Sequence, residues 1–300
     1  MLFDSILLMY NTAYGNVAVC LATAMAIQVA CYCASVIPRT EKFYDASGSA
    51  TFLVVILASL LHESWFSYLK TNEILFPEFA SFHPRQLLAS TMIAVWTLRL
   101  GTFLLYRIFK EGKDSRFDEL KKNAFMFFIP WSIQALWVIF LSLPVIFVNS
   151  APAHLHPSLN LLDLTGFAIW AFGFIFESVA DFQKLSWRHE RPEHREKFIQ
   201  HGLWSVSRHP NYFGEIVLWW GVWILCWNSL AQMTKQHFIP EWAAQSTLIS
   251  PIFDAFLLLF VSGIPPLEES SNRKFGSLKA YQEYKRRTPI LIPKLWKSSN

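Results

Sequence analysis

The chain has 300 residues, of which 53% are hydrophobic and only 16% charged, and its formal net charge is +4. Long apolar runs and 13 tryptophans exclude an ordinary soluble domain and predict an integral membrane protein. The four cysteines all fall in the apolar runs, so neither a disulfide framework nor a thiolate metal site is indicated.

The apolar runs predict an all-α, polytopic membrane bundle of about seven transmembrane helices, because a span needs about 20 residues and an unpaired backbone cannot lie in hydrocarbon. In chain order, the expected spans cover residues 16–37, 52–69, 87–106, 124–148, 161–180, 212–230 and 247–266. No low-complexity linker or composition break divides the chain. We therefore expect one membrane domain over residues 1–300.

Basic residues predict the orientation of the bundle. The loops after spans 1, 3 and 5 and the tail after span 7 carry 22 of the 26 Lys and Arg residues, whereas the loop between spans 4 and 5 carries none. This alternation predicts a cytoplasmic C-terminus and an outside N-terminus. The positive charge thus reflects topology, with membrane lipids as partners and no nucleic acid. In a eukaryote, the expected location would be the endoplasmic reticulum membrane.

The segment from Glu177 to His201 predicts a span end that runs into an amphipathic surface helix. Asp181, Lys184 and Arg188 share one face at spacings of i, i+3 and i+7. An acid at a span end among bases needs a specific partner, which a ribose hydroxyl or an internal arginine would equally supply.

The densest polar motif is GLWSVSRHPNYFGE, residues 202–215, which lies between two apolar segments. Polar groups that enter a bilayer cost several kcal/mol each unless they are partnered, so they mark a functional site by default. A simple helix start at Pro210 would explain the proline and one or two charges. It would not explain the whole polar set, which is Arg208, His209, Asn211, Tyr212 and Glu215.

Neither GxGxxG nor GxxxxGK[ST] occurs, so a bound nucleotide would be held by these helix-end residues. Arginine suits phosphate through bidentate charge-assisted bonds, and Asn211 offers a donor and an acceptor. The histidines of the cytoplasmic loops lack the spacing of a helical metal-binding pair, so we expect no metal site.

Several motifs in order resemble the steroid 5α-reductase superfamily, within it the branch of short polytopic proteins similar to the C-terminal part of 3-oxo-5α-steroid 4-dehydrogenases. The motifs are WTLRLGTFLLYRI (96–108), KDSRFDEL (113–120), QALW (134–137), FESVADFQ (176–183), the 202–215 motif with WWG (219–221), SGIPPLEES (262–270) and YQEYKRRTPILIP (281–293).

The resemblance implies an NADPH-dependent reduction of a carbon–carbon double bond conjugated to a carbonyl, on a hydrophobic small molecule or lipid. The N-terminal spans, to about residue 150, would form the lipid-substrate side, and residues 160–300 would bind the cofactor. Glu268 also lies in the polar C-terminal stretch where relatives contact the dinucleotide. The implied cofactor-binding residues are Asp181, Arg188, Arg208, His209, Asn211, Tyr212, Glu215, Glu269 and Arg273.

The chain departs from the steroid enzymes at the expected catalytic positions. Where those enzymes use a Gln-Glu pair and a tyrosine, this sequence has His62-Glu63 and, on the next span, Arg99. Glu63 would serve as the acid, and Arg99 would stabilise an oxyanion but not donate a proton. Alternatively, the two residues pair with each other inside the bundle.

Two other functions stay open. The RHPNYFGE run before a Trp-rich span also resembles membrane methyltransferases that use S-adenosylmethionine on isoprenylcysteine or phospholipid headgroups. A non-catalytic sterol-binding protein with a degenerate site is the third possibility. The full motif set and the basic loop favour the NADPH reductase.

Overall fold

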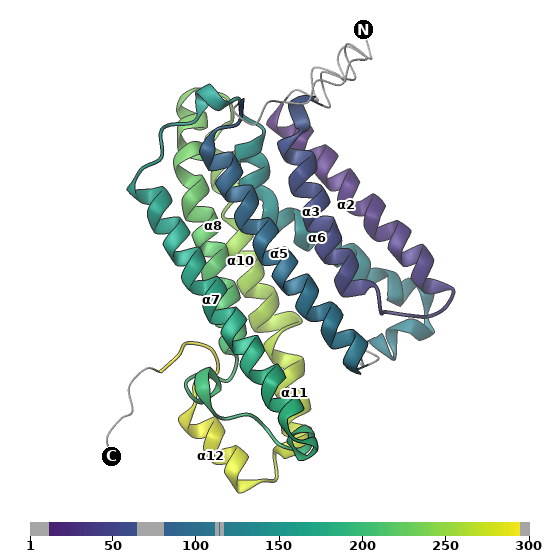
Figure 1. The fold of residues 1–300 in the computed structure, drawn as a ribbon. Helices are drawn as coiled ribbons and strands as arrows, with labels where there is room; N and C mark the ends of the chain where they lie inside the picture. The colour runs from purple at the N-terminus through teal and green to yellow at the C-terminus, as the bar shows by residue number, and fades with distance from the viewer. Residues whose placement is uncertain (1–11, 65–80, 112–113, 115–116, 295–300) are drawn as a thin grey trace. The chain divides into compact units, whose positions relative to one another are not determined.

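The computed structural model describes residues 12–64, 81–111, 114 and 117–294, and every regular element within these ranges is helical (Figure 1). Six helical stretches are long and apolar enough to cross a membrane, and a shorter apolar helix adds a seventh. The expected all-α membrane bundle is confirmed. The helices are α2 (Ala13–Val36), α3 (Tyr44–Leu60), α5 (Pro84–Glu111), α6 (Ala124–Asn149), α7 (Leu161–Glu190), α8 (Pro210–Lys235), α9 (Glu241–Ser246), α10 (Ile249–Phe256), α11 (Ile264–Phe275) and α12 (Lys279–Arg287).

Contacts divide the chain into two compact units. Unit 1 contains residues 1–164 and 222–250, and unit 2 contains residues 165–221 and 251–300. The chain therefore passes from one unit to the other three times. The second half of α8 belongs with the N-terminal helices in unit 1.

In unit 1, α3 packs against α2, α5 and α6. A Cβ atom added at Gly48 would lie only 2.5 Å from the amide nitrogen of Gln134, so glycine is needed where α3 approaches α6. Gln28 donates to Thr51 across 2.8 Å, and Ser47 donates to Gln134 across 3.1 Å. Small and polar residues are typical of helix contacts in a bilayer, because they allow close approach and satisfy one another.

These contacts explain why α3 differs from the expected second span. We predicted residues 52–69, but α3 begins at Tyr44, and residues 65–69 lie outside the described part of the chain. Its first turns read YDASGSA and lack the apolar side chains that a hydropathy scan detects. They face neighbouring helices rather than lipid.

The loops at one end of unit 1 are tied together by Glu41. Its carboxylate accepts hydrogen bonds from the ammonium of Lys121 and, across 3.0 Å, from the backbone N–H of Asp114. Burial alone would raise the pKa of Glu41, but these donors hold it below its usual value. The loops that follow spans 1 and 3 thus lie at the same end, as their shared basic character predicts.

Unit 2 contains most of α7 and the first half of α8, which approach closely through glycines. A Cβ atom added at Gly214 would lie 2.6 Å from the backbone nitrogen of Glu177, and one at Gly173 would lie 2.5 Å from the carbonyl oxygen of Gly214. Side chains at these two positions would force the helices apart.

The predicted surface helix after span 5 is wrong. Helix α7 runs without interruption from Leu161 to Glu190, over 30 residues. At 1.5 Å per residue this is about 45 Å, which exceeds the roughly 30 Å of hydrocarbon that a span must cross. No glycine or proline interrupts the chain after Gly173 until Pro192, so nothing ends the helix at residue 180.

The last span is not a single α-helix. Helix α10 passes into a π-helical turn at Leu257–Val261, and α11 starts anew at Ile264, with prolines in its first turn. Gly263 stands at the break, where a Cβ atom would collide with the carbonyl oxygen of Leu258. Because of this break, the start of α11 at Ile264 determines which of its side chains point into unit 2.

Candidate cofactor site

The 202–215 motif forms a turn, a connector and the start of a helix. Gly202 begins a short 3₁₀ turn with a φ of 59°, which only glycine adopts readily. Pro210 is the first residue of α8, where a missing N–H costs nothing. The connector between them runs beside the C-terminal segment, because Arg208 N donates to Pro289 O across 2.9 Å and Lys294 N donates to Val206 O across 3.0 Å.

Arg208 and His209 both bind the carboxylate of Glu268 on α11. Nη1 of Arg208 lies 2.5 Å from Oε2 of Glu268, and Nε2 of His209 lies 3.0 Å from Oε1. All three side chains are less than a fifth exposed. Lys285 on α12 adds a more distant ammonium, 3.7 Å from Oε2. The structure therefore brings a cation, a histidine and a carboxylate together from motifs about sixty residues apart.

The environment of His209 favours its neutral form. Burial lowers its pKa, and Glu268 opposes that shift only in part, while Lys184 and Arg208 add to it. Its ring stacks on that of Tyr212, with centroids 5.7 Å apart and planes at 5°. His209 thus donates to Glu268 through Nε2–H while its orientation is fixed by Tyr212.

Buried acids continue the site along α7 and α8. Asp181 is 7% exposed and Glu215 is 8% exposed, as expected for residues with specific partners. Lys184 lies over the ring of Trp204, 4.4 Å from its centroid, and Trp204 donates its indole N–H to Ala180 O. The charged face of α7 predicted from sequence therefore lies against the turn that begins the 202–215 motif.

Two polar groups of the motif keep donors available. Nε of Arg208 is buried without a hydrogen-bond partner among the described residues. The half-buried side chain of Asn211 likewise makes no hydrogen bond within the described part of the chain. Buried polar groups are normally satisfied, so such donors are suited to a ligand.

On α11, the structure places Glu268 rather than Glu269 beside Arg208. Glu269 and Arg273, which the sequence assigned to the cofactor, are both more than two-thirds exposed and pair with each other at 3.1 Å. Ile264 and Phe275 are buried on the same helical face as Glu268. This i, i+4, i+11 pattern is the signal that could have distinguished the two neighbouring acids.

The tyrosines that follow have a structural role. Tyr281 and Tyr284 form an aromatic cluster with Phe198 and Phe275. The hydroxyl of Tyr284 donates to Trp204 O across 2.7 Å, and burial raises its pKa. The cluster attaches α12 to the turn at Trp204, which leads into Arg208 and His209.

Comparison with known families identifies the family of the chain. A family model described as protein of unknown function (DUF1295) matches residues 31–288. The chain belongs to the DUF1295 family. This family is in the steroid 5α-reductase-like superfamily. No curated protein and no solved structure matched the chain.

In this DUF1295 protein, the two residues expected to act on the substrate do not lie together. Helices α3 and α5 run antiparallel, with Phe52 against Trp96 and Asp45 against Arg107. Arg99 is therefore level with the middle of α3, whereas Glu63 is exposed beyond its end at Leu60. The offset is about a dozen residues, or roughly 18 Å along the helix axis. The alternative of a Glu63–Arg99 pair inside the bundle is not what this arrangement shows.

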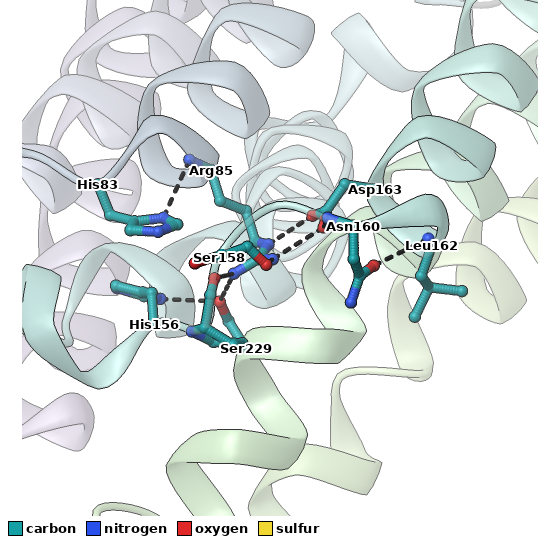
Figure 2. Close-up of polar contacts among 9 residues, drawn as sticks. His83, Arg85, His156, Ser158, Asn160, Leu162, Asp163 and Ser229 are labelled. Carbon is teal, nitrogen blue, oxygen red and sulfur yellow. Dashed lines mark hydrogen bonds and ion pairs between the residues drawn. The ribbon is translucent and has the colours of Figure 1, made fainter.

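Unit 1 also contains a buried ion pair that was not among the expected sites. Arg85 is fully buried and forms a two-pronged contact with Asp163, through Nε at 2.5 Å and Nη2 at 2.8 Å (Figure 2). Its Nη1 also donates to Ser229 Oγ across 2.7 Å. Asp163 in turn accepts from Asn160 N, as in a helix capping box. The N-x-x-D spacing before an apolar run was the available signal.

Two histidines complete this cluster, His156 on the loop between α6 and α7 and His83 directly before α5. His156 Nδ1 lies 2.8 Å from Ser229 Oγ (Figure 2), and its Nε2 lies 3.2 Å from Ala151 O. The ring of His83 stacks on that of His156, 5.0 Å away. Both ring nitrogens of His156 thus have partners within the protein. The cluster therefore has a structural role, because it joins Arg85 at the start of α5 to the loop before α7 and to Ser229 on α8. Among the described residues, no three His, Cys, Asp or Glu side chains are grouped to hold a metal ion.

Proposed function

We propose that the protein is a membrane-embedded NADPH-dependent reductase of a carbon–carbon double bond conjugated to a carbonyl in a hydrophobic substrate. The observation that carries this proposal is the convergence of Arg208 and His209 with Glu268. The resemblance expects dinucleotide contacts in both of these stretches, and the fold brings them to one buried cluster. The relation of the DUF1295 family to steroid 5α-reductase-like proteins supports the same class of reaction.

The donors at this cluster fit a dinucleotide. The guanidinium of Arg208 already holds one carboxylate and keeps its buried Nε for another anionic oxygen. The Asn211 amide can donate to and accept from an amide or a base edge. Lys184 and Arg188 add positive charge on the α7 face that carries Asp181, which suits the additional phosphate of NADPH.

Bound NADPH would supply the hydride for the β-carbon of the double bond. The chain would orient the dinucleotide through Arg208 and Asn211, while the apolar spans would keep the reacting carbon away from water. A proton must also reach the substrate. Glu63 is the expected acid, whereas Arg99 could only stabilise negative charge on the carbonyl oxygen. Their separation means that one carbonyl would contact one of them, not both.

The product of the reaction provides the test. Purified protein in neutral detergent would be incubated with NADPH and a panel of enone lipids, and products would be analysed by mass spectrometry. We expect a product heavier by two hydrogens, with one NADPH consumed for each product formed. Methyl transfer from S-adenosylmethionine would support the methyltransferase instead. Binding of sterols with no conversion under any condition would support the non-catalytic alternative.

A further inference from the structure

Glu268 occupies the place where an anionic ligand would be expected. Arg208 contacts one of its carboxylate oxygens, His209 contacts the other, and Lys285 lies within 3.7 Å of the first. Three donors from two separate segments therefore converge on one small anion. A phosphate group offers the same kind of charged oxygens to the same donors.

The carboxylate belongs to a side chain that can leave. Glu268 lies on the second turn of α11, just after the break at Gly263, and its side chain is 17% exposed rather than fully enclosed. Its two oxygens accept from Arg208 and His209, and within the described residues no backbone N–H donates to them. Rotation of the glutamate side chain would free both donors without unfolding a helix.

Around Glu268, some hydrogen-bond donors are not used by its carboxylate. Nε of Arg208 stays buried without a partner among the described residues. Asn211, two residues after His209, also keeps its amide free of hydrogen bonds within the described chain. A larger anion with more oxygens would satisfy donors that a carboxylate leaves unused.

We propose that Glu268 is a displaceable internal anion, which holds Arg208 and His209 in place until a phosphate group of the ligand takes its position. The identification of that phosphate as part of a dinucleotide rests on the proposed function. Because the ligand must first break the two charge-assisted hydrogen bonds of Glu268, it binds more weakly than it would if Glu268 were absent. The carboxylate thereby keeps the cations from binding other anions when the cofactor is absent.

Glu268→Gln tests this inference. The amide keeps the shape of the side chain but removes its charge, so residue 268 competes less strongly with an anionic ligand for Arg208. We expect affinity for inorganic pyrophosphate and for NADP⁺ to rise about ten- to a hundredfold, measured by titration calorimetry in neutral detergent. Glu268→Asp, whose shorter side chain cannot reach both donors, should show a smaller rise. The control is Glu283→Gln, which removes the same charge at an exposed position of α12, away from Arg208.

Thermal stability gives a second readout if the variant is less stable. Without ligand, Glu268→Gln should melt at a lower temperature than the wild type, and pyrophosphate should restore its midpoint. A residue that only supports the fold would give a lower midpoint with no such rescue.

The outcomes separate this inference from the proposed function. Tighter pyrophosphate binding with no binding of NADP⁺ would preserve the displaceable anion and contradict the dinucleotide. NADP⁺ binding that is unchanged or weakened in Glu268→Gln would preserve the dinucleotide and overturn the displaceable anion. Absence of pyrophosphate binding by both proteins would also overturn it, as would tightening seen only towards micelles that contain phosphatidylglycerol.

Discussion

At the scale of single residues, two polar clusters differ in how fully their hydrogen-bond donors are used. In unit 2, Arg208 and Asn211 keep donors without partners among the described residues. In unit 1, Arg85 is buried with its charge matched by Asp163 and its other donors satisfied. A cluster with spare donors is suited to a ligand, whereas a fully satisfied one holds the protein together.

The first prediction concerns Asn211. Asn211→Ala should weaken NADPH binding by roughly five- to a hundredfold, because a hydrogen-bonding side chain is lost from the site. Its thermal midpoint should stay unchanged, since the amide has no partner within the described protein. Asn123→Ala is the reciprocal control: its side chain caps α6 by accepting from Met126 N, so the variant should lose about 1 kcal/mol of stability and bind NADPH normally. The opposite pattern in the two variants would disprove the assignment.

The second prediction concerns the buried ion pair. Asp163→Ala should destabilise the protein by about 3–5 kcal/mol, because Arg85 would remain buried without its counter-charge. Replacing both residues, as Arg85→Met with Asp163→Leu, should cost less than Asp163→Ala alone. Asp45→Ala is the matched control, since its partner Arg107 is a third exposed and such pairs contribute about 1 kcal/mol or less. Equal losses in Asp163→Ala and Asp45→Ala, measured by denaturant unfolding, would contradict the structural role of Arg85.

At the scale of elements, the sequence predicts the existence of the spans better than their ends. Apolar runs identify helices that face lipid, but α3 begins in a stretch of small residues that face other helices, so hydropathy placed it too late. The predicted end of the fifth span near residue 180 is too early, because α7 continues through its charged turns as one helix to Glu190. Which of two adjacent acids on α11 enters the site depends on the phase of that helix, set by its start at Ile264 after the π-helical turn.

The third prediction concerns the pH dependence of stability, which follows from the buried ring of His156. Burial lowers the pKa of His156 to about 4 from its ordinary value near 6.5. Between these two values the unfolded chain binds a proton that the folded protein does not, so stability should fall as the pH decreases from 6.5 to 4. The loss should approach about 3 kcal/mol at most. Its physical cause is the burial of the ring, which the hydrogen bond to Ala151 O offsets only in part.

His156→Gln should flatten that pH dependence, as seen in the free energy of unfolding measured across the same range. His154→Gln, on the exposed part of the same loop, should retain most of it. Arg85, His83 and His154 each lower the pKa of His156 through their charge, so His154→Gln should reduce the slope only slightly, and burial also lowers the pKa of His83. An unchanged slope in His156→Gln would assign the pH dependence to His83 instead.

At the scale of the whole molecule, alternate loop charge predicts which end faces the cytoplasm. The structure supports the pairing of loops in unit 1, where Lys121 binds Glu41, while His156 lies with Arg85 at the ends of α5 and α7. Tags in the 113–122 loop and at the C-terminus should therefore be reached by reagents from the cytoplasm, and a tag beside His154 should not. Labelling that places the C-terminus outside would overturn the orientation and the access of a cytoplasmic cofactor to Arg208.

Cofactor binding to the purified protein tests the central claim most directly. A ligand that binds only the folded state stabilises it by about 2.7 kcal/mol at a hundred times its dissociation constant, so NADPH should raise the thermal midpoint in neutral detergent. NADH should raise it less, because it lacks the phosphate suited to the basic groups around Arg208. A shift with S-adenosylmethionine and none with NADPH would contradict the reductase.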